Sequence, residues 1–333
     1  MAIQRPIPRD TNRLFQQHLG TCRNLGLLLD KFNPWQQQRD GGWKLSFTVE
    51  EQRRGQGQRV EKNEGEAKRL WLSDSSTDNR VQLVDRPLAP NSRIDQALLA
   101  AHYQRWYSTV QTLGAEHFEL TSDARLVVGL GGESTLETAL TLHRVHGFPV
   151  IPGSALKGLA RTVAFFEVAQ SLGIHALDAA SLQQHQDNEK PTALKKLETL
   201  LESDLNDDKS VEPLLAYIQQ QKHTLTADAK VHTLSPAAFA KETQVRNFQT
   251  TFGYLGQAGS VIFFDAVPVA VPSFELDVMN PHYPDYYRDE NGRTAPSDDQ
   301  SPNPVAFLTV AAGASFGLHW RHAATTKLKI EMQ

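Results

Sequence analysis

The amino-acid sequence predicts an α+β fold in which helices and short apolar strands both contribute to the core. Apolar residues recur at helical spacing between residues 96 and 113 and again after Ser154. Residues 117–128 have a strand-like pattern, and residues 260–271 are rich in Val, Ile and Phe, which is typical of strands. With 333 residues, of which 40% are hydrophobic and 22% charged, the chain has the composition of a globular protein with a sizeable core.

The first third of the chain is predicted to be an extension of helices and loops, residues 1–116. Two short helices are expected before Pro34, and a capping-box pattern at Ser92 starts a core helix that runs through the following twenty residues. Residues 50–69 mix acids, bases and glycines, which predicts a mobile loop or hairpin tip. A sharper alternative is an RNA-contacting arm that uses its arginines, Arg53, Arg54 and Arg59.

The second part, residues 117–333, is predicted to form the main domain. Its first strand runs into a glycine turn, at which we expect close approach of a ligand or a neighbouring chain, formed by Gly129, Gly131 and Gly132. Residues 171–245 are polar and predict a helical insertion with short helices near 192–202 and 211–221. A second glycine turn at 253–259 precedes a strand, so the order differs from that of a P-loop or a dinucleotide-binding fingerprint. Further strands are expected at 274–283 and, as one strand or a hairpin, after Pro304.

The stretch VHGFPVIPGSALKGLAR, residues 145–161, predicts a helix whose start can hold an anion. Ser154 is a good N-cap residue, and Lys157 and Arg161 follow at spacings of three and four on the same face. The opposite face is apolar and is expected to pack on a sheet through Leu156, Leu159, Ala160, Val163 and Phe166. By spacing alone, an ordinary capped helix with solvated basic residues is the favoured interpretation of the pattern.

Charge and cysteine content restrict the classes of function. The net charge of −4 excludes a global basic field, so any RNA surface must be local. A single cysteine, Cys22, excludes an intramolecular disulfide framework and fits a reducing compartment. Because neither a membrane-length apolar run nor a hydrophobic signal core is visible, we expect a cytoplasmic protein that makes no contact with a membrane.

Three catalytic or metal-binding interpretations have less support in the sequence than the anion site. Ser154 and Lys157 match the S-x-x-K of penicillin-recognising enzymes, but the companion S-D-N and K-T-G motifs are missing. His143 and His146 form an isolated H-x-x-H, for which core or surface histidines are the simpler interpretation. Asp265 and Asp277 are candidates for a carboxylate pair in metal-assisted RNA cleavage, but nothing in the sequence brings them together.

Taken together, four blocks resemble the RAMP superfamily of CRISPR proteins. The signature block is VGLGGESTLETALTLHRVHGFPVIPGSALKGLAR, residues 128–161. The other three are NLGLLLDKF, then FGYLGQAGSVIFFDAVPV, then ELDVMNPHYPDYY followed by PNPVAFLTV. Their order is similar to that in the sixth-subunit type of the type III-B (Cmr) effector complexes.

This resemblance implies a ferredoxin-like, RRM-related domain with large helical insertions. It also implies a subunit without catalysis or cofactor that binds guide RNA (crRNA) near its 3′ end and supports target RNA binding. Its neighbours would be the repeated RAMP backbone subunit and another terminal RAMP subunit. Carried over to this chain, the motif places Ser154, Lys157 and Arg161 near the guide backbone and lines the neighbouring loop with Gly129, Gly131 and Gly132.

Two alternatives remain open at this point. A RAMP ribonuclease that processes guide precursor or cuts target RNA would need a general base, for which His143, His146 and His282 are the candidates. A subunit that contacts only protein is the other. The chain also departs from the superfamily pattern, which usually ends with a helix, a G-x-G-A-K-T-x-x-G-Y-G-like segment and a last strand. These C-terminal elements are expected to be missing or to be supplied by another polypeptide.

Overall fold

The computed structural model contains both helices and sheets, which confirms the mixed helix-and-sheet class. The structure describes residues 8–18, 21–31, 94–132, 140–176, 191–221, 224–279, 283–289, 295 and 305–323. Between residues 35 and 83 it describes five short strands. The chain divides into two compact units, each of which is described by itself. Unit 1 comprises Met1–Ser108, Phe118–Ile151 and Ala266–Leu318, and unit 2 comprises Thr109–His117, Pro152–Asp265 and His319–Gln333. The predicted boundary at residues 116 and 117 stays a prediction.

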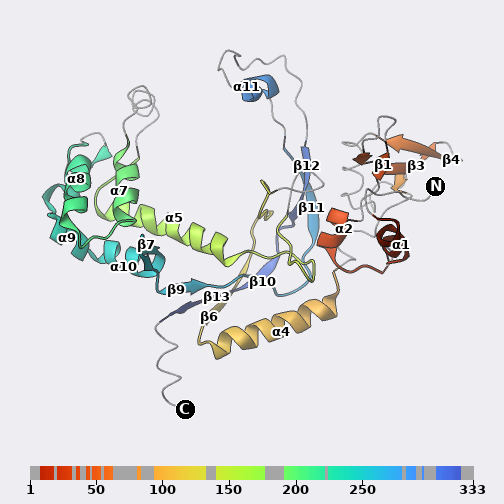
Figure 1. Ribbon diagram of the computed structural model, residues 1–333, viewed down its shortest axis with the longest axis horizontal. Coiled ribbons are helices and arrows are strands. Elements are labelled where there is room, and N and C mark those ends of the chain that lie inside the picture. Colours follow the sequence, from red (N-terminus) through yellow and green to blue (C-terminus); the bar gives the residue numbers. More distant parts are fainter. Residues whose placement is uncertain are drawn as a thin grey trace. The chain divides into compact units, whose positions relative to one another are not determined.

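Unit 1 begins with two short helices and a set of short strands (Figure 1). The elements are α1 (Arg9–His18), α2 (Leu25–Lys31), β1 (Trp35–Gln37), β2 (Trp43–Leu45), β3 (Phe47–Arg53), β4 (Gln56–Lys62) and β5 (Val81–Leu83). Strands β3 and β4 form an antiparallel hairpin in which Arg53 lies opposite Gln56. The hairpin interpretation is therefore confirmed for the described part of 50–62, while Arg54 and residues 63–69 lie outside the described residues. The strands β1 to β5 also correct the expectation that this part of the chain consists of helices and loops.

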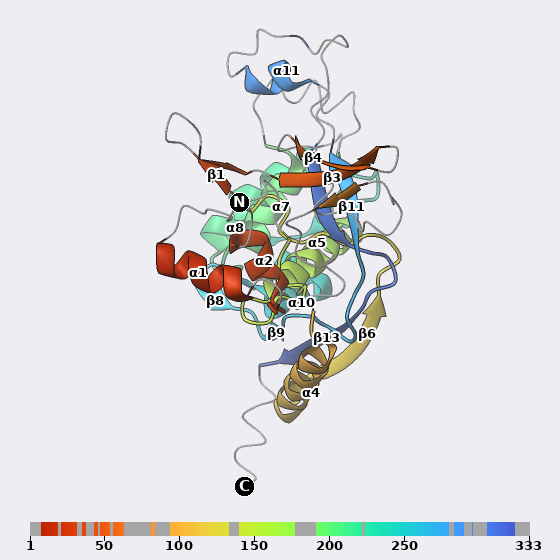
Figure 2. The same cartoon turned by 90° about the vertical axis from the view of Figure 1, so that its right-hand side faces the viewer.

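The long helix α4 (Gln96–Thr112) packs beside β6 (Glu116–Thr121) and β13 (Ser315–His322) (Figures 1 and 2). Its N-cap is Asp95, whose Oδ1 accepts the Leu98 N–H at 3.0 Å, and Ser92 lies outside the described residues. Tyr103 is buried on α4 and lies against Gly317 of β13. The Tyr103 hydroxyl donates to Glu119 Oε1 at 2.8 Å, so its polar end is satisfied while its ring fills the core.

The C-terminal strands belong to two different sheets. Strand β11 (Phe274–Met279) pairs antiparallel with β12 (Val305–Val310), and α11 (Pro284–Arg288) lies between them in sequence. Strand β13 instead lies between β6 and β10 (Val267–Pro268), and its last residues pair with β9 (Val261–Phe263). The expected single strand or hairpin after Pro304 is thus two strands with different partners.

Unit 2 is built around the helix α5 (Gly153–Ser171), beside which the other helices of this unit gather in Figure 1. These are α7 (Ala193–Leu201), α8 (Asp208–Gln219), the 3-10 helix η3 (Lys230–Thr233), α9 (Pro236–Lys241) and α10 (Thr243–Phe252). The two helices predicted near 192–202 and 211–221 are confirmed as α7 and α8. The core between them is fully buried at Leu197, Leu200, Val211, Phe239 and Val245. A short hairpin, β7 (Gly253–Tyr254) and β8 (Gln257–Ala258), leads from α10 into β9.

None of the helices in the described ranges has the combination of length and apolar character that would let it cross a membrane.

Candidate nucleic-acid interface

The predicted anion motif begins at a close approach between two backbone segments. A Cβ atom at Gly153 would overlap the carbonyl oxygen of Phe263 and lie 3.0 Å from the carbonyl carbon of Phe264, so only glycine fits here. This approach brings the carboxylate of Asp265 to the helix start, where Oδ1 accepts the Gly153 N–H at 2.8 Å. The helix therefore receives its capping acceptor from a residue more than a hundred positions further along the chain.

The predicted N-cap role of Ser154 is wrong. The N-cap residue is Pro152, no side chain of the cap residue accepts a hydrogen bond, and Ser154 is the second helical residue. The Pro152 carbonyl accepts the N–H groups of Ala155 and Leu156 at 2.9 and 3.1 Å. Of the first four helical amides, the one at Ser154 has no acceptor among the described residues. A ligand can therefore reach this amide and the exposed Ser154 hydroxyl.

Lys157 and Arg161 differ in what they contact. Arg161 donates to Glu202 Oε1 at 2.5 Å and lies 3.6 Å from Glu198 Oε1, and its guanidinium lies 5.5 Å from the centre of the Phe248 ring. It therefore ties α5 to α7 and α10, which are the helices that α5 packs against. Within the described parts of the chain, Lys157 forms no ion pair. Lys157 is consequently the predicted cation that remains able to meet a phosphate.

The carboxylates around Arg161 form a small charge network. Lys195 Nζ lies 2.7 Å from Glu198 Oε2. This hydrogen bond lowers the pKa of Glu198 and raises that of Lys195, with the Arg161 charge contributing to the first effect. Glu198 therefore stays ionised near neutral pH, and its charge offsets that of Arg161 within unit 2.

Three of the five residues on the predicted apolar face of α5 are exposed, so the expected packing on a sheet is wrong for them, whereas Leu156 and Ala160 are partly buried. Leu159 is 67% exposed, Val163 54% and Phe166 53%. The buried residues of this helix include Val168 and Ala169 near its C-terminal end, because α7 and α10 pack against a different face. The three exposed side chains follow at spacings of four and three and therefore form one continuous stripe, which we call the α5 stripe. A contiguous exposed apolar surface of this kind favours contact with another macromolecule.

The glycine turn predicted to line the site belongs to unit 1 and is exposed. Gly132 donates its N–H to the Gly129 carbonyl at 2.9 Å, which closes the turn, and Gly129 has a φ of 86°. Gly131 has no atom within 4 Å of the position a Cβ would occupy. The backbone of the turn is thus exposed at Gly131, and its close approach to a ligand stays a prediction.

The candidate carboxylate pair is engaged in two separate contacts. Asp265 accepts the Gly153 N–H in unit 2, whereas Asp277 Oδ2 lies 2.9 Å from Arg125 Nη1 in unit 1. Arg125 also lies 3.5 Å from Glu275, so it bridges two acids on β11. Each acid therefore has a structural partner of its own.

A third histidine, from the distant helix α4, lies next to the two histidines of the H-x-x-H motif. His102 of α4 lies against His143 and His146, with ring centroids 4.9 and 5.1 Å away. Burial and the neighbouring His143 and His146 lower the pKa of His102 to about 4. His282, the other candidate general base, lies outside the described residues.

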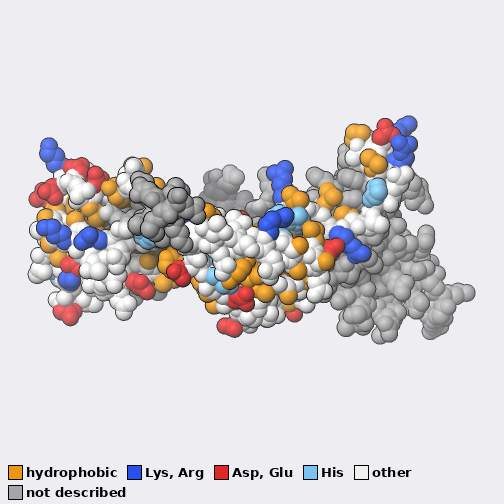
Figure 3. Space-filling model, turned by 90° about the horizontal axis from the view of Figure 1, so that it is seen from below, with side chains coloured by type: hydrophobic (Ala, Val, Ile, Leu, Met, Phe, Trp, Pro, Cys, Tyr) orange, Lys and Arg blue, Asp and Glu red, His pale blue; other side chains and the backbone are white. Residues whose placement is uncertain are grey.

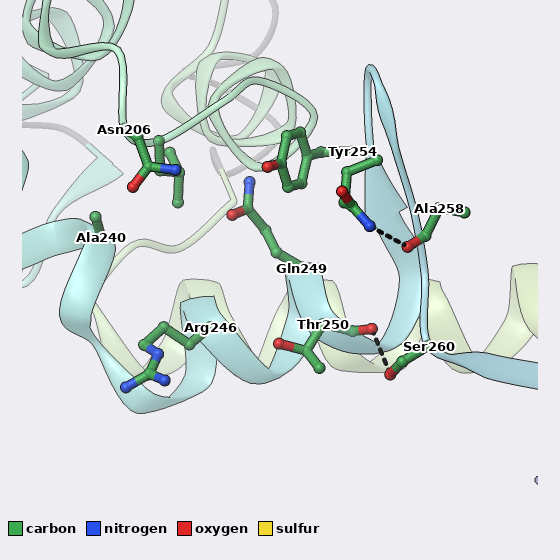
Figure 4. Close-up of a pocket in the computed structure, with 10 residues that line it drawn as sticks. Asn206, Ala240, Arg246, Gln249, Thr250, Tyr254, Ala258 and Ser260 are labelled. Carbon is green, nitrogen blue, oxygen red and sulfur yellow. Dashed lines mark hydrogen bonds between the residues drawn. The ribbon is translucent and has the colours of Figure 1, made fainter. Parts of the chain in front are cut away.

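A polar cavity of about 350 Å³ in unit 2 escaped the sequence-based interpretation (Figure 4). Gln249 extends between Asn206 and Tyr254 and donates to the carbonyls of Leu201 and Ser203 at 3.1 and 2.8 Å. The positive charge of the lining comes from Arg246. The glycines at 253–259 predicted a turn here. The helical part of the lining comes mostly from α10, through Arg246, Gln249 and Thr250, and the spacing of these residues indicated no binding site.

Basic residues are scattered on the surface. On the face shown in Figure 3, Lys and Arg side chains form small separate groups beside Asp and Glu side chains. This distribution agrees with the net charge of −4 and with an interface that is local.

A histidine pair in unit 2, of which His319 is buried, predicts that the stability of the fold is sensitive to acid. His319 of β13 is 2% exposed and its ring lies 4.3 Å from that of His117. Burial, and then the charge of His117, lower the pKa of His319 from 6.5 to about 4. As the pH falls, the His319 imidazole is protonated in the unfolded chain before it is protonated in the folded one. The free energy of unfolding is therefore highest above pH 6.5 and decreases as the pH falls towards 4. The free energy of unfolding should therefore drop by up to about 1.4 kcal/mol per pH unit in this window.

Denaturant unfolding at several pH values between 4 and 7 checks this expectation. The substitution His319→Gln should flatten the pH dependence, whatever it does to stability at pH 7. The control His232→Gln replaces an exposed histidine of η3 and should leave the slope unchanged. Equal slopes for His319→Gln and the unmodified chain would contradict the assignment.

Comparison with known proteins agrees with the motif. The sequence model of the RAMP superfamily matches residues 118–314. The CRISPR system Cmr subunit Cmr6 of Pyrococcus furiosus is 30% identical over 226 residues, which cover 66% of this chain and 61% of that protein. The matched part of this chain thus spans less than two thirds of the length of that relative.

Two solved structures also match. The crystal structure of Cmr6 from Pyrococcus furiosus has a TM-score of 0.33 at 27% identity and covers 66% of this chain and 86% of that one. A cryo-EM structure of the Type III-B Cmr-beta bound to cognate target RNA has a TM-score of 0.37 at 16% identity and covers 69% of this chain and 54% of the matched one. The family assignment rests on the sequence matches.

Proposed function

Because this chain belongs to the RAMP superfamily, we propose that it is a guide-RNA-binding structural subunit of a type III-B (Cmr) CRISPR complex. The observation that carries this proposal is the 30% identity to a Cmr6 subunit over 226 residues. In this role the chain binds the crRNA near its 3′ end, supports target RNA binding, and acts in the cytoplasm without catalysis or cofactor. Its partners are the repeated RAMP backbone subunit and a neighbouring terminal subunit, and residues 117–333 adopt a ferredoxin-like arrangement with a helical insertion at about 171–245.

The proposed guide contact on α5 consists of the Ser154 amide and hydroxyl and the Lys157 ammonium. These groups are one helical turn apart on one face, and the amide has no acceptor in the described part of the chain. Asp265 already places a negative charge at the first helical amide, so a phosphate binds beside the helix start, next to Lys157, rather than on the axis. The exposed turn at Gly129, Gly131 and Gly132 is proposed as a second backbone contact.

Arg161 receives a different role from the one its spacing predicts. Two carboxylates and an aromatic ring hold its guanidinium, so it positions α5 and does not meet the phosphate. The α5 stripe of Leu159, Val163 and Phe166 is proposed to pack on a neighbouring subunit, because an exposed apolar helix face is stabilised by such a contact.

The substitution Lys157→Ala should weaken guide binding through the loss of one phosphate contact. We expect the slope of log affinity against log salt to fall by about 0.7 for single-stranded RNA. The measurement is binding of a labelled guide RNA by the purified chain at several salt concentrations. Lys209→Ala, which removes an exposed cation of α8, is the matched control and should leave the slope unchanged.

The test can also contradict the proposal. If Lys157→Ala and Lys209→Ala give the same slope as the unmodified chain, Lys157 makes no phosphate contact. Incubation of the chain with labelled precursor and target RNA tests the non-catalytic role. Cleavage that disappears when His143 or His146 is replaced by Ala would establish a ribonuclease instead.

A further inference from the structure

Three imidazoles from two distant parts of the sequence meet in unit 1. His102 comes from α4, whereas His143 and His146 come from the turn between Leu142 and Pro149, which form an isolated β-bridge. One possible ligand nitrogen from each ring can be chosen so that all three lie within 4.8 Å of one another. The ring centroids of His143 and His146 are 4.7 Å apart, and those two rings are nearly parallel.

The turn that carries two of these histidines is held firmly. The Gly147 N–H donates to the His143 carbonyl at 2.7 Å, and Asn24 Nδ2 donates to the Val145 carbonyl at 2.8 Å. Gly147 has a φ of 73°, and a Cβ there would overlap the backbone nitrogen of Leu25, so the turn lies directly on the start of α2. Donor atoms on such a fixed turn are already close to the geometry that a bound ion requires.

Two ring nitrogen atoms of the cluster are weakly engaged in hydrogen bonding. His102 Nδ1 is buried and has no hydrogen-bond partner among the described residues. His143 Nδ1 accepts the N–H groups of His146 and Val145 at 3.2 and 3.3 Å, which are long contacts and cost little to replace. A buried ring nitrogen without a partner is unfavourable, and an ion or a proton can satisfy it.

The donor set selects the kind of ion. Among the residues that the structure describes, the group consists of three imidazoles. This donor set suits zinc and its neighbours among the late transition metals, and it suits Mg²⁺ and Ca²⁺ poorly. With Zn–N bonds of about 2.0–2.1 Å, tetrahedral ligands are about 3.3 Å apart. The three nitrogens must therefore approach one another by small side-chain rotations, and Phe148, which is 1% exposed and contacts all three rings, limits how far they can move.

We propose that His102, His143 and His146 bind one divalent late-transition-metal ion, which links α4 to the turn at residues 142–149. A tetrahedral ion in this site keeps its fourth position for water or an anion. Because binding must displace the hydrogen bonds at His143 or select the other ring tautomer, the affinity for the ion is lower than that of a site whose ligands are free. This inference does not depend on RNA binding, and it fits equally well with a structural or a regulatory ion.

The test uses the full chain without an affinity tag, stripped with a chelator and dialysed. Titration with Co²⁺ should give one equivalent of binding with the visible absorption of a tetrahedral site, and Zn²⁺ should abolish that absorption by displacement. The variants His102→Phe and His146→Phe retain a ring for packing and lose the ligand, so each should weaken Zn²⁺ binding at least tenfold. His232→Gln, at an exposed histidine of η3, is the matched control and should bind as the unmodified chain does.

The outcomes separate the alternatives. Circular dichroism shows whether each variant is folded, and if His102→Phe fails to fold, His146→Phe decides the question. Binding at less than one equivalent, or binding that survives both Phe substitutions, would overturn the proposal. In that case the cluster is an aromatic packing unit around Phe148. Failure of the Lys157 experiment on guide RNA would leave this result untouched, because the two tests involve different residues and different ligands.

Discussion

Replacing Gly153 by Ala should destabilise the chain by about 3 kcal/mol, although it places the best helix former at a helical position. The added Cβ would overlap the Phe263 carbonyl oxygen and lie 2.9 Å from the Phe263 carbonyl carbon. Both atoms are backbone, so no side-chain rotation relieves the overlap. Overpacking of this kind costs about 1–3 kcal/mol. The shift of α5 also breaks the hydrogen bond from Gly153 to Asp265, which is a capping contact of about 1 kcal/mol.

Gly158 offers a matched control on the same helix. It is exposed, and no atom lies within 4 Å of the position its Cβ would occupy. Gly158→Ala should therefore stabilise the chain by up to about 1 kcal/mol, because alanine loses less backbone entropy in a helix. Equilibrium denaturation of the two variants should give free energy changes of opposite sign. The same sign for both would mean that the approach of α5 to residues 263–265 is absent in solution.

A third variant separates the two parts of the Gly153 effect. Asp265→Ala removes the acceptor and leaves the close approach in place, so it should cost only the capping part, about 1 kcal/mol. The remainder of the Gly153→Ala effect then measures the steric conflict. The motif glycine is thus required by packing against the chain itself, in addition to any role near RNA.

The helix at the motif illustrates what local sequence can and cannot predict. Its existence and its start near residue 153 follow from the glycine, the serine and the helical spacing after them. The identity of the capping group does not, because Asp265 is 112 positions away and only the folded chain brings it close. The Ser154 side chain was expected to cap, and it is left exposed instead.

The faces of α5 were misassigned for a related reason. Periodicity identifies an apolar stripe but does not say which neighbour covers it. The helices of the 171–245 segment cover the part of α5 around Val168 and Ala169, whereas Phe166 remains half exposed. Likewise Arg161 looked like a free cation because the acids that hold it lie on α7 and at its C-cap, thirty-seven and forty-one positions further on.

The histidine cluster shows the same limit. The pair His143 and His146 is visible as a motif, and on its own it was best interpreted as ordinary core or surface residues. The third ring comes from His102, which stands among the aromatic residues of α4 and carries no spacing signal. A site whose three residues come from separate elements is therefore visible in the three-dimensional structure and not as a sequence motif.

Phe239→Ala should give the largest loss of stability among these variants, about 3–5 kcal/mol. Phe239 lies on α9, is 0% exposed, and belongs to the buried cluster that joins α5, α7, α8 and α10. Removing the ring leaves a cavity that surrounding side chains from four helices fill only in part. Because unit 2 depends on this one core, hydrogen exchange should accelerate in all of its helices together.

Phe166→Ala removes the same side chain from the exposed α5 stripe and is the matched control. Since Phe166 is 53% exposed, its loss should change the free energy of unfolding by less than about 1 kcal/mol and leave hydrogen exchange in α9 as it was. If the α5 stripe packs on a neighbouring subunit, Phe166→Ala should instead reduce retention of the folded chain in the assembled complex. Comparable destabilisation by the two variants would show that α5 buries this face within the chain, and the proposed assembly surface would then have to lie elsewhere.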